Sequence, residues 1–206
     1  MKEFYEHYWK TRGHSGNRPR YAIFLSWLTD NIKLLDVGCG DGYFLQAVKS
    51  KLNNVEELGL DISAQAIEFC RGRNLNARLF NASDPWDFAD KSFDYVVISE
   101  VLEHLVNTEE ALAEAKRIAR KGVLVSIPNI ALYKHRLRLM FGGRFPKQWA
   151  VAPEEHLRYF SLTDFKETLT KLGFTIAEVK AGSGTRILRN IWPNLFANQI
   201  CFKLIP

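Results

Sequence analysis

Two carboxylates and an imidazole stand close together near the middle of the chain, in the stretch ISEVLEHL. Glu100, Glu103 and His104 occupy positions i, i+3 and i+4, which share one face if a helical turn begins there. Such a set can act as a general base or bind a divalent cation. The same side chains can equally cap a turn, form an ion pair or support a pocket. We expect no metal centre, and these three residues are the candidates if one exists.

His156, in the stretch PEEHLRYFS, is a further candidate for proton transfer. It precedes a predicted helix, and it can either face the ligand from a covering segment or simply hold a loop in place. Because a nucleophilic hydroxyl must lose its proton, we name Glu100, His104 and His156 as the catalytic candidates.

A second chemically distinctive stretch, LLDVGCGDGYF, occupies residues 34–44. Glycines at alternate positions after a strand-like run are typical of a loop that cradles a nucleotide-like ligand. A dinucleotide-binding fold requires a small residue where this chain has Tyr43. A pyrophosphate would also be repelled by Asp41, at the start of the following helix. A nicotinamide-dependent dehydrogenase is therefore disfavoured.

Further acids favour S-adenosylmethionine, a cofactor that carries a sulfonium cation and no phosphate. Asp36 precedes the glycines, and Asp61 ends the second strand-like segment about 20 residues farther on. A carboxylate at that place can accept hydrogen bonds from both ribose hydroxyls. The alternative is a plain turn after the strand, with Asp61 as a helix-capping acid.

The elements that must position these residues alternate along the chain. Strand-like segments cover 33–38, 57–62, 76–82, 93–100, 121–129, 174–182 and 197–205, and helix-like segments cover 41–52, 63–73, 107–120 and 161–173. Alternation of this kind predicts a parallel sheet with helices on both faces. The last two strands have no helix-like segment between them and should form an antiparallel hairpin. We therefore predict an α/β, Rossmann-like, doubly wound sheet of seven strands.

The 206 residues suit a single domain, in which 1–30 form an N-terminal helical cap and 129–160 a lid inserted over the active site. Residues 129–150 contain no acid and six basic or imidazole side chains: Lys134, His135, Arg136, Arg138, Arg144 and Lys147. A short amphipathic helix there, with Tyr133, Leu137, Met140 and Phe141 on one face, could hold an anionic substrate, lie on a membrane surface or bind a partner.

Composition narrows the remaining classes. The three cysteines, Cys39, Cys70 and Cys201, have neither disulfide-like nor metal-like spacing, which favours a reducing, cytoplasmic location. No apolar run approaches the roughly 20 residues of a transmembrane helix. The net charge of +5 is modest, so nucleic-acid binding is not expected and any membrane-surface contact should be weak. The oligomeric state is left open.

Residues 34–128 resemble the class I S-adenosylmethionine-dependent methyltransferase superfamily, through LLDVGCGDG, GLDIS, SFDYVVISEVLEHL and LVSIPN. Over roughly residues 30–175 the chain is most similar to the MetW-like small-molecule branch, because SIPNIALYKHRLRLMFGGRFP and HLRYFSLTDF resemble its C-terminal half. The resemblance implies cofactor contacts at Asp36, Gly38, Cys39, Gly40, Asp61, Ile62, Asn81 and Ala82. The superfamily usually has an acid beside the adenine, where this chain has Asn81 unless Asp84 serves.

The same resemblance implies an S-adenosylmethionine-dependent methyltransferase that acts on a small molecule, and O-methylation is expected. One alternative is a MetW-like methionine-biosynthesis protein that works with an acyltransferase partner. Another is an RNA 2′-O-methyltransferase, since E-x-x-E-H also resembles the metal-binding pattern of such enzymes and of ubiquinone-pathway O-methyltransferases. The chain is short for an RNA enzyme.

Overall fold

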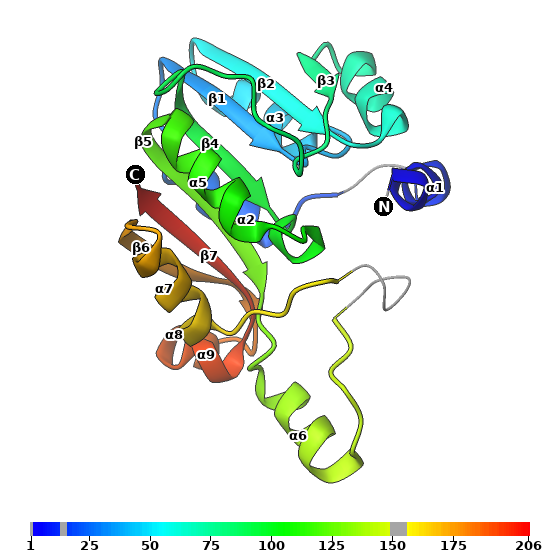
Figure 1. Cartoon of the computed structure of the whole chain (residues 1–206), viewed down its shortest axis with the longest axis vertical. Helices are drawn as coiled ribbons and strands as arrows, with labels where there is room; N and C mark the ends of the chain where they lie inside the picture. Colours follow the sequence, from blue (N-terminus) through cyan, green and yellow to red (C-terminus); the bar gives the residue numbers. More distant parts are fainter. Residues whose placement is uncertain (1, 13–15, 149–155) are drawn as a thin grey trace.

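A computed structural model describes residues 2–12, 16–148 and 156–206. Its centre is one seven-stranded sheet in the order β3-β2-β1-β4-β5-β7-β6 (Figure 1). The strands are β1 (Ile32–Val37), β2 (Val55–Asp61), β3 (Ala77–Leu79), β4 (Phe93–Ser99), β5 (Ala119–Pro128), β6 (Thr175–Gly184) and β7 (Ala197–Ile205). The first five are parallel, and β7 runs antiparallel between β5 and β6. The predicted Rossmann-like fold and its antiparallel C-terminal strands are confirmed.

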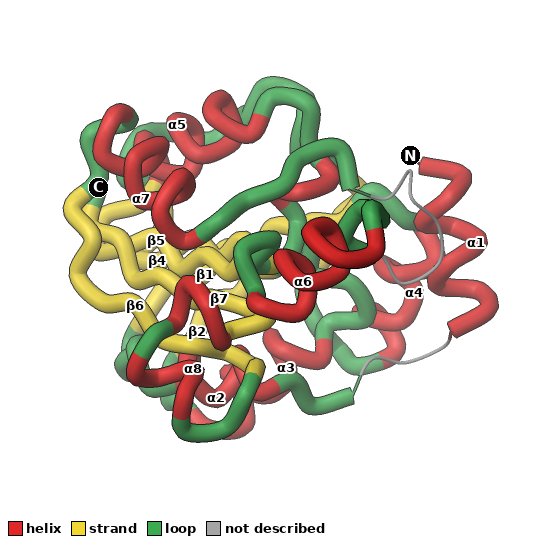
Figure 2. Tube along the Cα trace, turned by 90° about the horizontal axis from the view of Figure 1, so that it is seen from below, coloured by secondary structure: helices red, strands yellow, loops and turns green. Residues whose placement is uncertain are grey.

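Helices cover both faces of this sheet. The helices of the described chain are α1 (Lys2–Arg12), α2 (Pro19–Leu25), α3 (Tyr43–Lys51), α4 (Ala64–Gly72), α5 (Thr108–Ile118), α6 (Tyr133–Gly142), α7 (Leu162–Lys171), α8 (Leu188–Ile191) and α9 (Pro193–Phe196), with a 3₁₀ turn η1 (Leu102–His104). Seen from below, α5 and α7 lie on one side of the strands and α2, α3 and α8 on the other (Figure 2).

The central strands send alternate side chains into two apolar cores, one on each face of the sheet. On β4, Val96 and Ile98 pack in the core that includes α5 and α7, whereas Tyr95 and Val97 pack in the core that includes α2 and α3. The strand is buried from Phe93 to Ile98, as its density of β-branched residues predicts. Burial on both faces gives a rigid frame from which the loops at the carboxyl ends project.

Three details differ from the sequence prediction. The single turns α8 and α9 lie between β6 and β7, where no helix was predicted, because four residues are too few to show a helical period. The edge strand β3 has three residues instead of the predicted 76–82. Glu100 is not helical: its φ is +57°, and η1 begins two residues later. A sharp bend at the end of β4 replaces the predicted helical turn.

The predicted N-terminal cap contains α1 and α2, and the predicted lid contains α6. Residues 1, 13–15 and 149–155 of these two segments lie outside the described residues. Within the described part of the chain, no helix combines the length and the apolar character that spanning a membrane requires. The assignment of one domain with a cap and a lid stays a prediction.

Candidate functional site

One cavity of about 360 Å³ lies at the carboxyl ends of β1, β2 and β4, where the strand order reverses direction. Its lining includes every predicted cofactor residue: Asp36, Gly38, Cys39, Gly40, Asp61, Ile62, Asn81 and Ala82. It also includes the three catalytic candidates Glu100, His104 and His156. The structure therefore brings all the predicted site residues to one cavity, and the role of each stays a prediction.

The loop after β1 forms the floor of this cavity. Gly38 and Gly40 have φ values of +77° and +55°, in the left-handed region that disfavours side chains. A Cβ on Gly38 would overlap Cγ2 of Val101, and a Cβ on Gly40 would lie 2.6 Å from the ring of Trp9. The missing side chains let the acid–histidine loop and α1 pack directly against the glycine loop.

Asp61 ties the glycine loop to the start of α4. Its Oδ2 accepts a hydrogen bond from the backbone N–H of Gly40 at 2.8 Å, and its Oδ1 accepts one from Ser63 at 3.0 Å. Ser63 is the N-cap of α4, and its side chain accepts a hydrogen bond from the backbone N–H of Ala66. Burial raises the pKa of Asp61 to about 6, although these backbone hydrogen bonds act in the opposite direction.

Asp36 is a buried acid with one unsatisfied carboxylate oxygen. Its Oδ1 receives no hydrogen bond from any described residue. Burial and the nearby Asp61 carboxylate raise the pKa of Asp36 to about 7, and Arg20 partly opposes this rise. Arg20 also lines the cavity and donates from Nε to Ser99 Oγ at 2.7 Å. A cationic group in the cavity would stabilise the ionised form of Asp36.

Asp41 has a different role from the predicted one. Its carboxylate is buried, and Oδ2 lies 3.0 Å from Nη1 of Arg73, which also donates to the Asp41 backbone carbonyl. The arginine neutralises the charge that was expected to repel a pyrophosphate. The argument against a dinucleotide therefore depends on Tyr43, whose ring stacks on Tyr21 at a centroid distance of 6.0 Å.

Helix α1 covers the cavity from the side of α4. The carboxylate of Glu6 accepts hydrogen bonds from the backbone N–H groups of Ala64 at 2.5 Å and Gln65 at 3.3 Å, at the start of α4. Four aromatic side chains of α1 line the cavity: Phe4, Tyr5, Tyr8 and Trp9. The sequence predicts a covering helix from its aromatic residues, but it contains no signal that Glu6 caps a helix 58 residues away.

The acid–histidine block lines the cavity after β4, and the ring centroid of His104 lies 5.6 Å from that of Tyr5 on α1. Glu103 is 1% exposed, and its Oε1 lies 3.8 Å from Nε2 of His104. Burial and the adjacent Glu100 carboxylate raise the pKa of Glu103 well above its usual value, which favours its neutral form. Neither Oε2 of Glu103 nor Oε1 of Glu100 has a hydrogen-bond partner among the described residues. Both acids are therefore poised to bind a group that enters the cavity.

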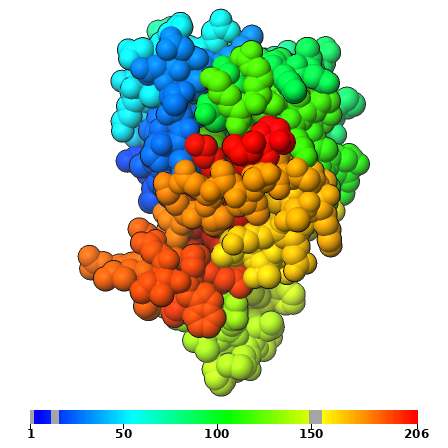
Figure 3. Space-filling model, turned by 90° about the vertical axis from the view of Figure 1, so that its left-hand side faces the viewer, coloured from blue at the N-terminus to red at the C-terminus, as the bar shows by residue number. Residues whose placement is uncertain are grey.

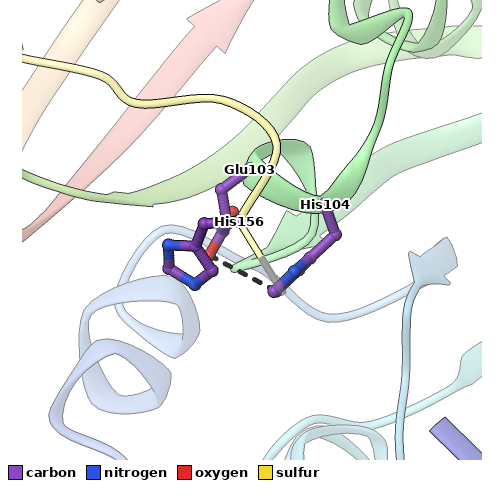
Figure 4. Close-up of side chains that lie close together, drawn as sticks. All are labelled: Glu103, His104 and His156. Carbon is purple, nitrogen blue, oxygen red and sulfur yellow. Dashed lines mark ion pairs between the residues drawn. The ribbon is translucent and has the colours of Figure 1, made fainter. Parts of the chain in front are cut away.

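His156 joins this block from a distant part of the chain. The backbone N–H groups of Leu157 and Arg158 donate to the carbonyl of Glu103 at 2.8 and 3.0 Å, and this clamp brings His156 beside His104. The two imidazole rings meet edge to face, 4.9 Å apart. Figure 4 shows Glu103, His104 and His156 gathered from the two segments.

The same three side chains are the part of the described site that could hold a metal ion. One donor atom each from Glu103, His104 and His156 lies within 4.8 Å of the others. A first-row divalent ion needs its ligand atoms about 2 Å from the metal, so the side chains would have to close around it. Glu100, a predicted candidate ligand, is not in this group, and His156 takes its place.

The cavity is suited to a cofactor with a cationic centre. Asp36 offers an unsatisfied buried oxygen, and the side-chain-free glycines leave room for a ligand against the backbone. Arg18 and Arg20, the arginines of the lining, lie outside the glycine loop itself. These residues therefore fit S-adenosylmethionine better than a phosphate-bearing dinucleotide.

Comparisons with known proteins agree with this geometry. The family model described as "Methionine biosynthesis protein MetW" matches residues 18–204. A bifunctional methionine biosynthesis protein MetXA/MetW of Rhodopirellula baltica is 28% identical over 184 residues, which cover 80% of this chain and 29% of that protein. The chain thus spans less than a third of that relative. A ubiquinone/menaquinone biosynthesis C-methyltransferase of Geotalea daltonii is 25% identical over 178 residues, 75% of each protein.

Solved structures show the same fold. The magnesium protoporphyrin IX methyltransferase of Synechocystis PCC 6803, with bound S-adenosylhomocysteine, superposes with a TM-score of 0.70 at 16% identity, covering 100% of this chain and 99% of that one. A methyltransferase of Archaeoglobus fulgidus has a TM-score of 0.67 at 20% identity, covering 99% and 94%. Together the matches confirm the predicted superfamily, the S-adenosylmethionine-dependent methyltransferases. The predicted fold, enzyme class and cofactor are confirmed with it.

Proposed function

Because the chain belongs to the MetW family, within the S-adenosylmethionine-dependent methyltransferases, we propose that it methylates an oxygen atom of a small molecule. The observation that carries this proposal is the meeting of His104 and His156 at the cavity that the cofactor residues also line. An oxygen nucleophile needs a base to remove its proton near neutral pH, and imidazole is the side chain best suited to that task.

The chain's own residues divide the work of holding the cofactor. Asp61 and the backbone of the glycine loop would bind the nucleoside part, and Asp36 would face positive charge. When bound, S-adenosylmethionine supplies an electrophilic methyl group. The α1 aromatics, including Trp9 above Gly40, would exclude water from the reacting atoms.

Proton removal falls to the imidazole pair. His104 or His156 would accept the proton of the acceptor hydroxyl, and Glu103, 3.8 Å from His104, would hold that ring in place. The methyl carbon is already reactive, so alignment of the acceptor contributes more than activation does. Arg18 and Arg20 in the lining favour an acceptor that carries negative charge.

We also propose a domain organisation and a cellular location for this enzyme. Residues 1–206 would form one domain, in which the segment 129–160 closes over the acceptor, since Gln148 and His156 both line the cavity. The three free, buried cysteines suit a cytoplasmic enzyme.

The first test is cofactor binding by calorimetry. Asp61→Ala removes the acceptor of two backbone hydrogen bonds and should weaken S-adenosylmethionine binding on the order of 100-fold, since charge-assisted hydrogen bonds contribute about 1.5–3 kcal/mol each. Asp94→Ala, at a buried acid distant from the cavity lining, is the matched control. Labelled methyl groups should then appear on a hydroxylated acid from a small-molecule panel. Absence of binding at millimolar cofactor would refute the proposal.

A partner-dependent role is the second candidate, and the fused MetXA/MetW relative favours it. In that case the chain would work with an acyltransferase of methionine biosynthesis. The two candidates separate in a pull-down with that acyltransferase from the same organism. Stable co-purification together with no methyl transfer to any acceptor would support the partner role. Methyl transfer by the purified chain alone would support the enzyme.

A further inference from the structure

Two separate segments expose most of the large apolar side chains on the described surface. Nine of the fourteen exposed ones belong to them: Leu137, Leu139, Met140, Phe141 and Phe145 in and after α6, and Ile187, Leu188, Ile191 and Trp192 in and beside α8. Phe141 and Ile187 are 78% and 75% exposed, which is unusual for such side chains. We call these nine residues the apolar end surface.

The charged side chains within the two segments that carry this surface all have one sign. Neither 129–148 nor 179–206 contains an aspartate or a glutamate. The exposed bases beside the apolar end surface are Lys134, Arg136, Arg138, Arg144, Lys147 and Arg186. A protein partner of mixed charge would leave such a one-sided set unmatched, whereas an anionic lipid surface matches it throughout.

The two segments lie at the same end of the molecule although about 45 residues separate them. α6 follows the carboxyl end of β5 and α8 follows that of β6, and these strands run in the same direction because both are antiparallel to β7. The ring of Tyr133 lies 5.6 Å from that of Phe196, and Asn129 Nδ2 donates to the carbonyl of Ala197 at 2.8 Å. Figure 3 shows the two segments, yellow-green and orange-red, projecting at this end.

Helix α6 receives little support from the rest of the protein. No residue of the helix is buried, and every residue from Arg136 to Phe145 is exposed. Helices of about ten residues are marginally stable in water without packing of an apolar face. A surface that buries Met140 and Phe141 would therefore stabilise the helix as well as cover them.

We propose that the apolar end surface docks on an anionic lipid bilayer, with Phe141, Met140 and Trp192 inserted among the lipids and the surrounding bases at the headgroups. Apolar residues with lysines and arginines at their flanks are the pattern of helices that lie in the membrane interface. Parallel strands place this surface at the edge of the sheet that also carries the cavity. A lipid-borne acceptor could then reach the cavity; that consequence rests on the proposed function, whereas docking does not.

Vesicle sedimentation with the full chain tests this proposal. We expect binding to vesicles of phosphatidylcholine with about 30% phosphatidylglycerol, none to pure phosphatidylcholine, and release as salt rises towards 1 M. Lys134→Glu should weaken binding about fivefold or more, from the attraction of a basic residue to an anionic surface. Lys51→Glu, an exposed lysine at the far end of α3, is the matched charge control and should retain binding.

Apolar variants test insertion separately. Met140→Ser with Phe141→Ser should reduce vesicle binding at least tenfold, whereas Val106→Ser, 63% exposed on another loop, should not. Cofactor binding by calorimetry should be equal in all variants, which shows that they fold. Equal loss in the Lys51 and Val106 controls, or no binding of the wild type to anionic vesicles, would overturn the proposal. So would a dimer in solution that Phe141→Ser dissociates.

Discussion

The two walls of the cavity are built in different ways. The cofactor wall comes from residues 36–63 and 81–82, and its hydrogen bonds link neighbouring loops, as between Asp61 and the backbone of Gly40. The acceptor wall joins the block 100–104 to His156, and backbone bonds to the Glu103 carbonyl bring them together. The cofactor wall is therefore formed by segments close together in the sequence, whereas the acceptor wall forms only when two distant segments meet.

This difference predicts different responses to mutation. Damage to the cofactor wall should change cofactor affinity and stability together, because the same bonds hold the loop and form the site. Damage to the acceptor wall should change turnover while the cofactor still binds, because the glycine loop is held by hydrogen bonds to Asp61.

The largest expected effect is loss of turnover in the acceptor wall. Replacing both histidines, His104→Gln with His156→Gln, should lower kcat by about 10²–10⁴, the usual range for a general base, with cofactor affinity unchanged. His135→Gln, on α6 outside the cavity lining, is the matched control. Steady-state kinetics and calorimetry measure the two quantities. A parallel loss of cofactor binding would show that the walls are not separable.

A smaller effect is expected from Gly38→Ala in the cofactor wall. The new Cβ would overlap Val101, and an alanine would have to adopt the positive φ of this position. We therefore expect a loss of about 2–5 kcal/mol in the free energy of unfolding from overpacking and backbone strain. Val101→Ala in the same chain should restore the overpacking part only. Urea denaturation gives both values. Gly72→Ala, where a Cβ meets open space and φ is not positive, should have little effect.

Loosening the contact between the segments of Val106 and His156 should lower the rate less than replacing both histidines does. Arg158 donates from Nε to the Val106 carbonyl at 3.1 Å, so Arg158→Ala should misplace His156 and lower kcat about tenfold. Arg158→Lys should recover part of the lost kcat. If Arg158→Ala changes the Kd of the cofactor but not kcat, the clamp belongs to the cofactor wall instead.

Asp36 in the cofactor wall should contribute to the pH dependence of stability, as the buried Glu103 of the acceptor wall also should. The pKa of Asp36 is raised to about 7, so its contribution to stability is full below about pH 4 and is lost as pH rises through about 7. Asp36→Asn should therefore flatten the fall in the free energy of unfolding over this range. Chemical denaturation at stepped pH, without cofactor, measures it. An unchanged slope would mean that Asp36 is ionised throughout.

The smallest expected effect is that of metal removal. With a base mechanism at the acceptor wall, a chelator should leave methyl transfer unchanged within about twofold. Loss of activity that Mg²⁺ or Mn²⁺ restores, together with abolition of metal binding by His156→Gln, would instead assign the group of Glu103, His104 and His156 to a metal. It would also revive the RNA alternative.

Much of the fold was predictable from local pattern. Burial of β4 on both faces follows from its dense β-branched residues, and the strand is buried from Phe93 to Ile98. The prediction was wrong where the signal was too short, as at α8 and α9, and at Glu100, where a positive φ replaces a helical turn. The neutralisation of Asp41 by Arg73 was also missed, because ion pairing across 32 residues leaves no periodic trace.

The amino-acid sequence by itself determined the superfamily, the sheet and the membership of the cofactor wall, since glycines, strand ends and an acid act through the backbone next to them. Only the tertiary structure decided that His156 stands beside His104, that Glu6 caps α4, and that α6 and α8 share one end. Such contacts depend on where each loop lies relative to the others in the folded sheet. The hydrophobic period and the residue types of a segment do not determine which distant segment it will contact.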